Sequence, residues 1–182
     1  MLLSICIPTF NRSECLNNCL NSILISSKNC QNKFEVCVSD NNSDQNVEDI
    51  INKFKSKINI KFNKNYKNLG HGRNFLKVVS MATGKYVWTI GDDDLILPHA
   101  IGTLFKIFNS NVNLDFFFIN SYNLESKFIF SFNQPFDTNN LPKKMQKYSN
   151  YQKSSQMNFF DLINPKISFD FLMGMYLLVF KK

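Results

Sequence analysis

The sequence predicts an α/β fold, a three-layer α/β/α sandwich with a mostly parallel central sheet. Two apolar patterns support this prediction: short alternating runs typical of strands, and longer runs at helical spacing. The two patterns follow one another in turn along residues 1–120. Strands that alternate with helices form a parallel-rich sheet that is covered on both faces.

The first two predicted elements are a buried strand and an amphipathic helix. Residues 3–7 alternate as in a strand, which should end at Pro8 because proline cannot donate to a ladder. Asn11 or Ser13 is a candidate cap for the helix that follows. Its apolar positions at helical spacing are Leu16, Cys19, Leu20, Ile23 and Leu24.

The same alternation continues to about residue 119. A second strand over residues 34–38 leads into a polar run, and a short helix around residues 47–54 precedes a third strand at residues 58–62. The later elements are a helix over residues 75–82 with Gly84 as its C-terminal cap, a strand at 86–90, a helix at 99–108 and a strand near 115–119.

The pattern weakens beyond residue 120. Residues 128–132 are predicted as a strand, residues 133–158 as a mobile loop or an insertion, and residues 169–180 as a buried apolar segment. No repeat or linker divides the chain, so one structural domain is expected.

Composition restricts the partners. The net charge of +7 suits acidic partners such as nucleotide phosphates, nucleic acid or anionic lipid. Because the basic residues are scattered and lack aromatic interleaving, nucleic acid is not expected. A signal peptide and a membrane-spanning segment are not expected either, which predicts a cytoplasmic protein. The five cysteines match neither a disulfide framework nor a zinc site, so we expect free thiols.

Polar residues follow three predicted strands at their carboxyl ends, where ligands bind in open α/β sheets. These segments are residues 8–12, 40–43 and 91–94. In the last of them, Asp92, Asp93 and Asp94 repel one another and favour a compensating Mg²⁺ or Mn²⁺ that leaves positions open for phosphate oxygens. The alternative is a solvated acidic turn that caps the next helix.

Two further features have both a functional and a structural interpretation. Asp40 could bind a nucleotide or simply cap the following helix. Residues 68–74 place two glycines and Arg73 at a helix start, where they could bind phosphate or form an ordinary turn.

Taken together, the motifs resemble glycosyltransferase family 2, and within it bacterial surface-polysaccharide enzymes of the abequosyltransferase-like group. The motifs that carry this resemblance are Ser4-Ile5-Cys6-Ile7-Pro8-Thr9-Phe10-Asn11-Arg12, Val38-Ser39-Asp40-Asn41-Asn42-Ser43, Asn68-Leu69-Gly70, Arg73-Asn74 and Gly91-Asp92-Asp93-Asp94 with Leu97-Pro98. They occur in consistent order over residues 2–120.

The resemblance implies a Rossmann-like GT-A fold, a nucleoside-diphosphate-sugar donor, a divalent metal and inversion at the anomeric carbon. Residues 1–120 would form the donor part, and residues 121–182 a partial, truncated acceptor side. By the same analogy Asp93 and Asp94 hold the metal. The implied donor-binding residues are Pro8, Thr9, Asn11, Asp40, Arg73 and Asp92.

An inverting enzyme needs a carboxylate base, and no motif identifies it in this sequence. The carboxylates past the aspartate-rich motif are Asp115, Glu125, Asp137, Asp161 and Asp170, of which the last two are favoured. The catalytic base therefore stays unassigned.

The expected acceptor is a glycan or a lipid-linked glycan, with peripheral contact at the inner face of the cell membrane. Two other functions stay open: a catalytically incomplete nucleotide-sugar-binding fragment, and a metal-dependent nucleotidyltransferase or phosphatase.

Overall fold

The computed structural model describes residues 1–28, 30, 33–110, 114–149, 153–156 and 178–182. Its helices and larger strands are β1 (Leu3–Thr9), α1 (Ser13–Ser26), β2 (Phe34–Asp40), α2 (Val47–Lys55), β3 (Ile60–Lys64), α3 (His71–Ser80), β4 (Tyr86–Thr89), α4 (Ala100–Asn109), β5 (Phe116–Phe118), α5 (Ser126–Phe130) and β8 (Leu178–Lys181). Two short strands, β6 (Tyr122–Asn123) and β7 (Gln146–Lys147), and the 3-10 helix η2 (Thr138–Asn140) complete the described elements.

The central sheet has the strand order β3-β2-β1-β4-β8-β5. β1 pairs in parallel with β2 and β4, and β2 pairs in parallel with β3. β8 is antiparallel to both β4 and β5. The sheet is therefore mostly parallel, as the sequence predicts.

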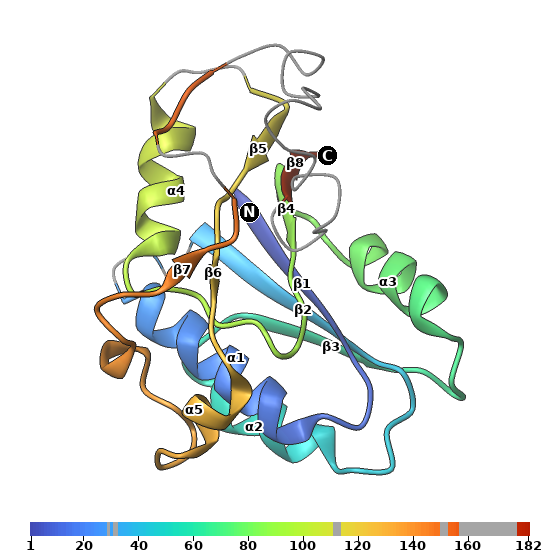
Figure 1. Ribbon diagram of the computed structural model, residues 1–182. Coiled ribbons are helices and arrows are strands. Elements are labelled where there is room, and N and C mark those ends of the chain that lie inside the picture. Colours follow the sequence, from blue (N-terminus) through green and yellow to red (C-terminus); the bar gives the residue numbers. More distant parts are fainter. Residues whose placement is uncertain (29, 31–32, 111–113, 150–152, 157–177) are drawn as a thin grey trace.

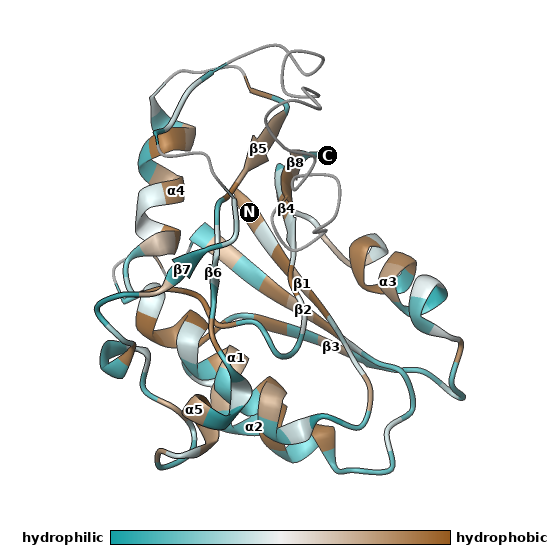
Figure 2. Cartoon of the chain, viewed as in Figure 1, coloured by the Kyte–Doolittle hydropathy of each residue, from teal (hydrophilic) through white to brown (hydrophobic). Residues whose placement is uncertain are grey.

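Helices cover both faces of the sheet and complete three layers. Figure 1 shows α1, α2 and α4 on one side of the sheet and α3 on the other. Alternate side chains of β1 enter two separate cores: Leu3, Ile5 and Ile7 pack on the α1 side, and Cys6 packs beside Val78 on the α3 side. In Figure 2, β1 and β5 are mainly hydrophobic, whereas β6 and β7 are hydrophilic.

β1 continues one residue past Pro8 and ends at Thr9. The pairing with β4 stops at Cys6, while the pairing with β2 continues to Thr9. At Pro8, β1 is therefore paired on one side only. A proline, which lacks a backbone N–H, is tolerated there because no ladder with β4 needs that donor.

Three local predictions were wrong. Arg12, not Asn11 or Ser13, is the N-cap of α1, and no side chain caps this helix by a hydrogen bond. α3 ends at Ser80 with Met81 as its cap, and Gly84 instead lies against β1, where a Cβ atom would come within 2.7 Å of the backbone of Leu3 and Ser4. The alternating phenylalanines of residues 128–132 belong largely to the helix α5, in which Ile129 is the buried residue. Short apolar runs of this kind do not distinguish a strand from a single helical turn.

The last described strand, β8, is an internal strand of the sheet, next to the edge strand β5. β8 lies between β4 and β5, with Val179 fully buried. The rest of the apolar segment predicted at residues 169–180 lies outside the described residues. All five cysteines are free thiols. Over the described ranges, no helix is both long enough and apolar enough to cross a membrane.

Candidate functional site

The three polar segments predicted at the carboxyl ends of the strands do meet at one edge of the sheet. Thr9 and Asp40 are Cα partners at the ends of β1 and β2. The hydroxyl of Thr9 donates to Asp92 Oδ2 at 2.7 Å, which ties the end of β1 to the turn after β4. Thr9 thus stands between the two predicted carboxylate sites.

The three carboxylates of the aspartate-rich turn differ in burial and in hydrogen-bond partners. Asp92 is buried and accepts hydrogen bonds from Thr9 and, at 3.3 Å, from Arg12 Nη1. Asp93 is more than half exposed and pairs with the same Arg12 nitrogen at 2.9 Å. Asp94 Oδ2 accepts the backbone N–H of Gly91 at 2.6 Å and so closes the turn.

Gly91 allows the turn to fold this tightly. A Cβ atom at this position would lie 2.7 Å from Asp93 Oδ1 and 3.2 Å from Asp94 Oδ2. The carboxylates of Asp93 and Asp94 therefore crowd the same side of the turn, and a side chain at position 91 would push them away.

The carboxylates perturb one another and their neighbours. Burial raises the pKa of Asp94 to about 6, and the negative charges of Asp93 and Asp92 add to this rise. Burial also raises the pKa of Asp92, against the lowering effect of Thr9 and Arg12. The pKa of Arg12 rises because Asp92, and then Asp93, stabilises the guanidinium charge. The cluster is thus an electronegative site that one arginine only partly neutralises.

The carboxylates are suited to a divalent cation that also binds ligand oxygens. They are not arranged as a site in which the protein supplies all the metal ligands. Carboxylate oxygens suit hard cations such as Mg²⁺ and Mn²⁺. Within the described ranges, however, no group of three or more histidine, cysteine or acidic residues is arranged to hold a metal by itself. A cation here would take one or two carboxylates, Asp93 and Asp94 being the candidates, and complete its shell with ligand and water oxygens.

Asp40 has a buried carboxylate, and only one of its two oxygens accepts hydrogen bonds from described residues. Its Oδ1 accepts the backbone N–H of Ser43 at 3.0 Å and the Ser43 hydroxyl at 2.5 Å. Its Oδ2 is buried and accepts no hydrogen bond from any described residue. Lys64 Nζ approaches Oδ2 only to 3.9 Å, which is too long for a hydrogen bond, so this ion pair leaves Oδ2 unsatisfied.

Asn11 joins the first two polar segments. It adopts a left-handed backbone with φ of 53°, a conformation that asparagine tolerates better than most residues. Its backbone N–H donates to Ser43 Oγ at 2.8 Å, and its side chain exchanges hydrogen bonds with Asp44. Pro8, the Cα partner of Ser39, lies immediately before this junction.

A network of buried amides supports the Asp40 side of the site. Asn74 Nδ2 donates to the Ser39 carbonyl, and Asn74 Oδ1 accepts from Ser39 Oγ and Asn65 Nδ2. Asn41 Oδ1 accepts from Asn65 Nδ2 and from the backbone N–H of Leu69. The network fixes the loop before α3 against the end of β2. The sequence motifs include some of these asparagines, but their spacing does not reveal their partners.

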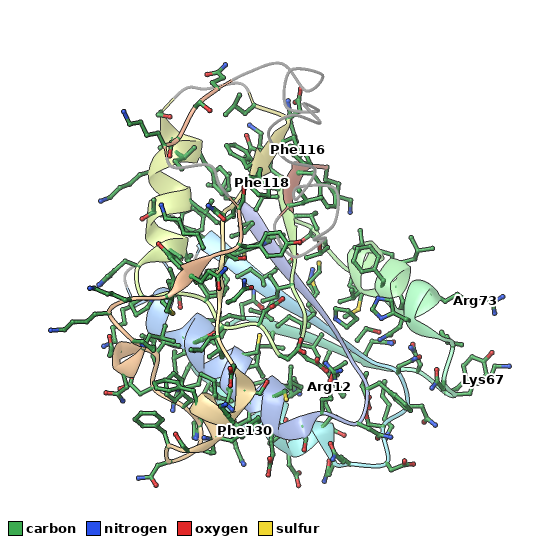
Figure 3. The ribbon with its side chains drawn as sticks, viewed as in Figure 1. Arg12, Lys67, Arg73, Phe116, Phe118 and Phe130 are labelled. Carbon is green, nitrogen blue, oxygen red and sulfur yellow. The ribbon has the colours of Figure 1, made fainter. Side chains whose placement is uncertain are left out.

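The structure brings most of the predicted donor residues together and leaves one apart. Thr9, Asn11, Asp40 and Asp92 are linked by the contacts above. Arg73 is exposed on α3, and Figure 3 shows it at the outer side of that helix, well separated from Arg12. Arg12 belongs to the predicted polar segment of residues 8–12 but was not among the predicted donor-binding residues, and it is the arginine that contacts the carboxylates.

The described carboxylates beyond the turn have structural contacts. Asp115 pairs with Lys181 at 3.0 Å, Glu125 pairs with Lys127 at 2.5 Å, and Asp137 caps η2 through Asn139. Asp161 and Asp170, favoured as the catalytic base, lie outside the described residues.

Comparison with known proteins identifies the family of this chain and several relatives. The model of the family described as glycosyl transferase family 2 matches residues 4–170. The abequosyltransferase RfbV of Salmonella typhimurium is 40% identical over 120 residues, which cover 63% of this chain and 34% of that protein. A Campylobacter jejuni protein named GalNAc(5)-diNAcBac-PP-undecaprenol beta-1,3-glucosyltransferase is 35% identical over 111 residues, which cover 57% of this chain and 33% of that protein.

A solved structure of similar fold extends the comparison. S. aureus TarS, residues 1–349, in complex with UDP-GlcNAc, superposes with a TM-score of 0.59 at 25% identity. The superposition covers 65% of this chain and 34% of that one. The chain therefore spans about a third of the length of each of these relatives.

Proposed function

Because the chain belongs to glycosyl transferase family 2, we propose that it binds a nucleoside-diphosphate sugar and transfers the sugar to a glycan or lipid-linked acceptor during synthesis of a bacterial surface polysaccharide. The chain has the GT-A fold that the motifs imply, an α/β architecture shared with TarS. The named transferases among the relatives support transfer, and the TarS complex with UDP-GlcNAc supports a nucleotide-sugar donor.

One observation carries the proposal: a buried carboxylate with one unsatisfied oxygen, Asp40, and a partly buried carboxylate cluster lie on either side of Thr9. Asp40 Oδ2 is an acceptor without a donor, and a nucleobase or ribose supplies N–H or O–H groups. Asp92, Asp93 and Asp94 form an electronegative site at the same sheet edge. Such a pair of sites matches a ligand with a hydrogen-bonding base at one end and a diphosphate, carried by a cation, at the other.

In this proposal the donor-binding residues have distinct tasks. Asp40 and Asn11 receive the nucleoside, Pro8 and Thr9 shape the floor of its pocket, and Thr9 holds Asp92 in place. Arg12 pairs with Asp92 and Asp93, and its half-exposed side chain would contact the diphosphate of a donor bound at these carboxylates. The role of Arg73 near the diphosphate stays a prediction, because its side chain points away from this cluster.

The metal would be Mg²⁺ or Mn²⁺ held by Asp93 and Asp94, and it would stabilise the charge that develops on the departing nucleoside diphosphate. We further propose inversion at the anomeric carbon. That step requires a base that deprotonates the acceptor hydroxyl opposite the leaving group. Of the carboxylates past the turn, Asp161 and Asp170 stay the favoured bases. A lipid-linked acceptor would place the reaction at the inner face of the cell membrane, where the net charge of +7 favours anionic lipids.

Calorimetric titration tests the donor site. UDP, GDP, CDP and dTDP are titrated into the chain with Mn²⁺ and again with a chelator. We expect one nucleotide to bind with Mn²⁺ and to lose most of its affinity with chelator and in Asp93→Ala. Glu48→Ala, an exposed carboxylate on α2, is the matched control and should bind normally. Failure of all four nucleotides to bind would refute the donor site.

The reaction products separate the proposal from its rivals. Incubation with the sugar conjugate of the nucleotide that binds, together with membranes as acceptor source, should release a nucleoside diphosphate. Release of pyrophosphate or inorganic phosphate would instead identify a nucleotidyltransferase or phosphatase. Binding without turnover would mean that the chain, about a third of the length of its relatives, is a donor-binding part alone.

A further inference from the structure

A hollow of small-molecule size lies where the end of α1 meets the start of α4. Ser26 Oγ accepts the backbone N–H of Ile101 at 3.1 Å and joins the two helices there. The volume of the hollow is about 470 Å³, within the range of about 300–1,000 Å³ that is usual for ligand sites. Its walls come from these two helices and from the segment that leads into β2. They include Lys28, Cys30, Lys33, His99, Phe105 and Lys106.

The hollow is distant from the proposed donor site. Lys33 immediately precedes β2, and its carbonyl accepts the backbone N–H of Leu2, so Lys33 lies at the amino ends of β1 and β2. Asp40 is the last residue of β2, at the opposite end of the strand. Because a strand rises about 3.3 Å per residue, the two positions are roughly 20 Å apart. A ligand in the hollow would therefore be separate from a nucleotide bound at Asp40.

Three lysines surround the hollow, and no described acidic residue lines it. The ammonium groups of Lys28, Lys33 and Lys106 form no ion pair with any residue that the structure describes. Lys61, by contrast, pairs with Glu35 at 2.9 Å. Like charges around one hollow repel one another, and a cleft lined by one sign of charge focuses the electric field. The hollow therefore attracts an anion.

The positive charge comes from the lysines and not from the helix ends. The amino end of α4, at His99, and the carboxyl end of α1, at Ser26, both line the hollow. Their partial charges have opposite signs and oppose each other. The rest of the wall includes the buried ring of Phe105 and the half-buried thiol of Cys30. The hollow thus combines cationic groups with apolar surface.

We propose that this hollow binds a phosphate ester, either a soluble phosphorylated small molecule or the head group of an anionic phospholipid. A phosphate group carries several charged acceptor oxygens, so it can pair with more than one lysine at once. The volume leaves room for an organic group beside the phosphate, against the apolar part of the wall. The inference is independent of the proposed function, because none of the donor-binding residues lines the hollow.

The half-buried thiols provide a measurement that is specific to the site. Cys15 and Cys30 are half-buried, whereas the other three cysteines are buried. Cys30 Sγ faces α4, 3.9 Å from the position of a Cβ atom on Gly102, and Cys15 lies within the electrostatic influence of Asp92 and Asp93. A ligand in the hollow should slow the alkylation of Cys30 by iodoacetamide and leave that of Cys15 unchanged. Peptide mass spectrometry measures both rates in one sample.

The probes are sn-glycerol 3-phosphate and vesicles of phosphatidylglycerol. A chelator is present throughout, so that the cation-dependent donor site stays empty, and potassium acetate at the same ionic strength controls for general screening. Calorimetry measures the affinity for the soluble ester, and cosedimentation measures binding to the vesicles. The triple variant Lys28→Gln/Lys33→Gln/Lys106→Gln should weaken binding of the effective probe about tenfold.

The matched control removes the same number of charges elsewhere. Lys53, Lys55 and Lys77 are exposed lysines on α2 and α3, and none of them lines the hollow. The triple variant Lys53→Gln/Lys55→Gln/Lys77→Gln has the same net charge as the first variant. It should bind the probe within about twofold of the unaltered chain.

The outcomes also identify the source of the phosphate. Protection of Cys30 by glycerol 3-phosphate supports a soluble ester, and protection by the vesicles alone supports a lipid head group. If neither probe protects Cys30, or if acetate or the control variant gives the same result as the phosphate probe or the first variant, the inference is wrong. Equal protection of Cys15 would also overturn it. Because no nucleotide takes part, failure here leaves the donor site untouched.

Discussion

Thr9 Oγ1 donates to Asp92 Oδ2 across 2.7 Å, although 83 residues separate the two positions in the sequence. Both side chains are buried, with exposures of 2% for Thr9 and 5% for Asp92. This hydrogen bond is one of the constraints that hold the turn after β4 against the end of β1. Without this donor, Arg12 would be the one side chain among the described residues that still donates to the buried carboxylate of Asp92.

Thr9→Val should lower the free energy of unfolding by about 1–3 kcal/mol, because it leaves the Asp92 oxygen buried without this partner while preserving the branched shape. Urea denaturation at neutral pH measures the loss. Thr9→Ser keeps a hydroxyl and should recover most of the stability. Equal stability of the valine and serine variants would show that the hydrogen bond contributes nothing.

Asp40→Asn tests whether the unsatisfied Asp40 oxygen reads the nucleotide. The amide oxygen can keep the bonds to Ser43, so stability should change by less than about 1 kcal/mol. The Oδ2 acceptor becomes a donor, and affinity for the nucleotide should fall at least tenfold in calorimetry. Asp44→Asn, an exposed carboxylate of the same turn, is the control and should bind within about twofold of the unaltered chain. Equal losses in both variants would argue against a specific role for Asp40.

Much of the sheet could be predicted because its strands carry local signals. β1, β2 and β4 alternate side chains between two apolar cores, and each ends in polar residues. β8 is different, because its place between β4 and β5 depends on pairing with residues far away in the sequence. Local periodicity contains no information on such partners, so the sequence predicts only that the segment is buried.

In the site, too, the types of residues could be predicted from the sequence, but their contact partners could not. The aspartates after β4 could be recognised by their clustering at a strand end. The contact of Arg12 with Asp92 and Asp93 could not be predicted, since it depends on the path of the turn between β1 and α1. The buried Asn18 amide, whose Nδ2 has no partner among the described residues, could not be predicted either, because the sequence of an amphipathic helix does not indicate that an asparagine in it is buried.

The amide network around Asn74 should be a major source of local stability. Asn74 is 3% exposed and makes three hydrogen bonds, two with Ser39 and one with Asn65. Asn74→Ala should cost about 2–4 kcal/mol, because it leaves several buried groups without partners. Lys77→Ala, on the exposed side of α3, is the control for a change in the same helix. A loss below about 1 kcal/mol in urea denaturation would contradict a structural role for the network.

Arg12 should compete with a metal ion for the carboxylates. Its Nη1 lies 2.9 Å from Asp93 and 3.3 Å from Asp92, and its side chain is half exposed. Arg12→Gln removes the competing charge, so Mn²⁺ in the absence of nucleotide should bind roughly fivefold more tightly, an effect limited by solvent screening. Calorimetry or the relaxation of water protons by Mn²⁺ measures the change, and Lys67→Gln, an exposed cation on another loop, is the control. Weaker Mn²⁺ binding in Arg12→Gln would show that the arginine does not compete.

Glu35 should make the stability of the chain depend on pH in acid. Its side chain is almost fully buried on β2, where Oε1 accepts from Ser4 and Thr83 and Oε2 pairs with Lys61 at 2.9 Å. Burial alone would raise the pKa of Glu35, but the hydrogen bonds from Lys61, Thr83 and Ser4 together hold it at about 2, below the ordinary 4.5. The ionised form is therefore the one that the folded state prefers.

The sign of the pH effect follows from this lowered pKa. The stabilisation by Glu35, about 3 kcal/mol, is fully present above the ordinary pKa of the unfolded chain and is lost as the pH falls toward 2. Glu35→Gln should be less stable by about this amount at pH 7, and its urea midpoint should vary less between pH 5 and pH 2.5 than that of the unaltered chain. Glu48→Gln, an exposed carboxylate on α2, should keep the original pH profile. If Glu35→Gln loses stability in acid as steeply as the unaltered chain, the acid sensitivity arises from other carboxylates.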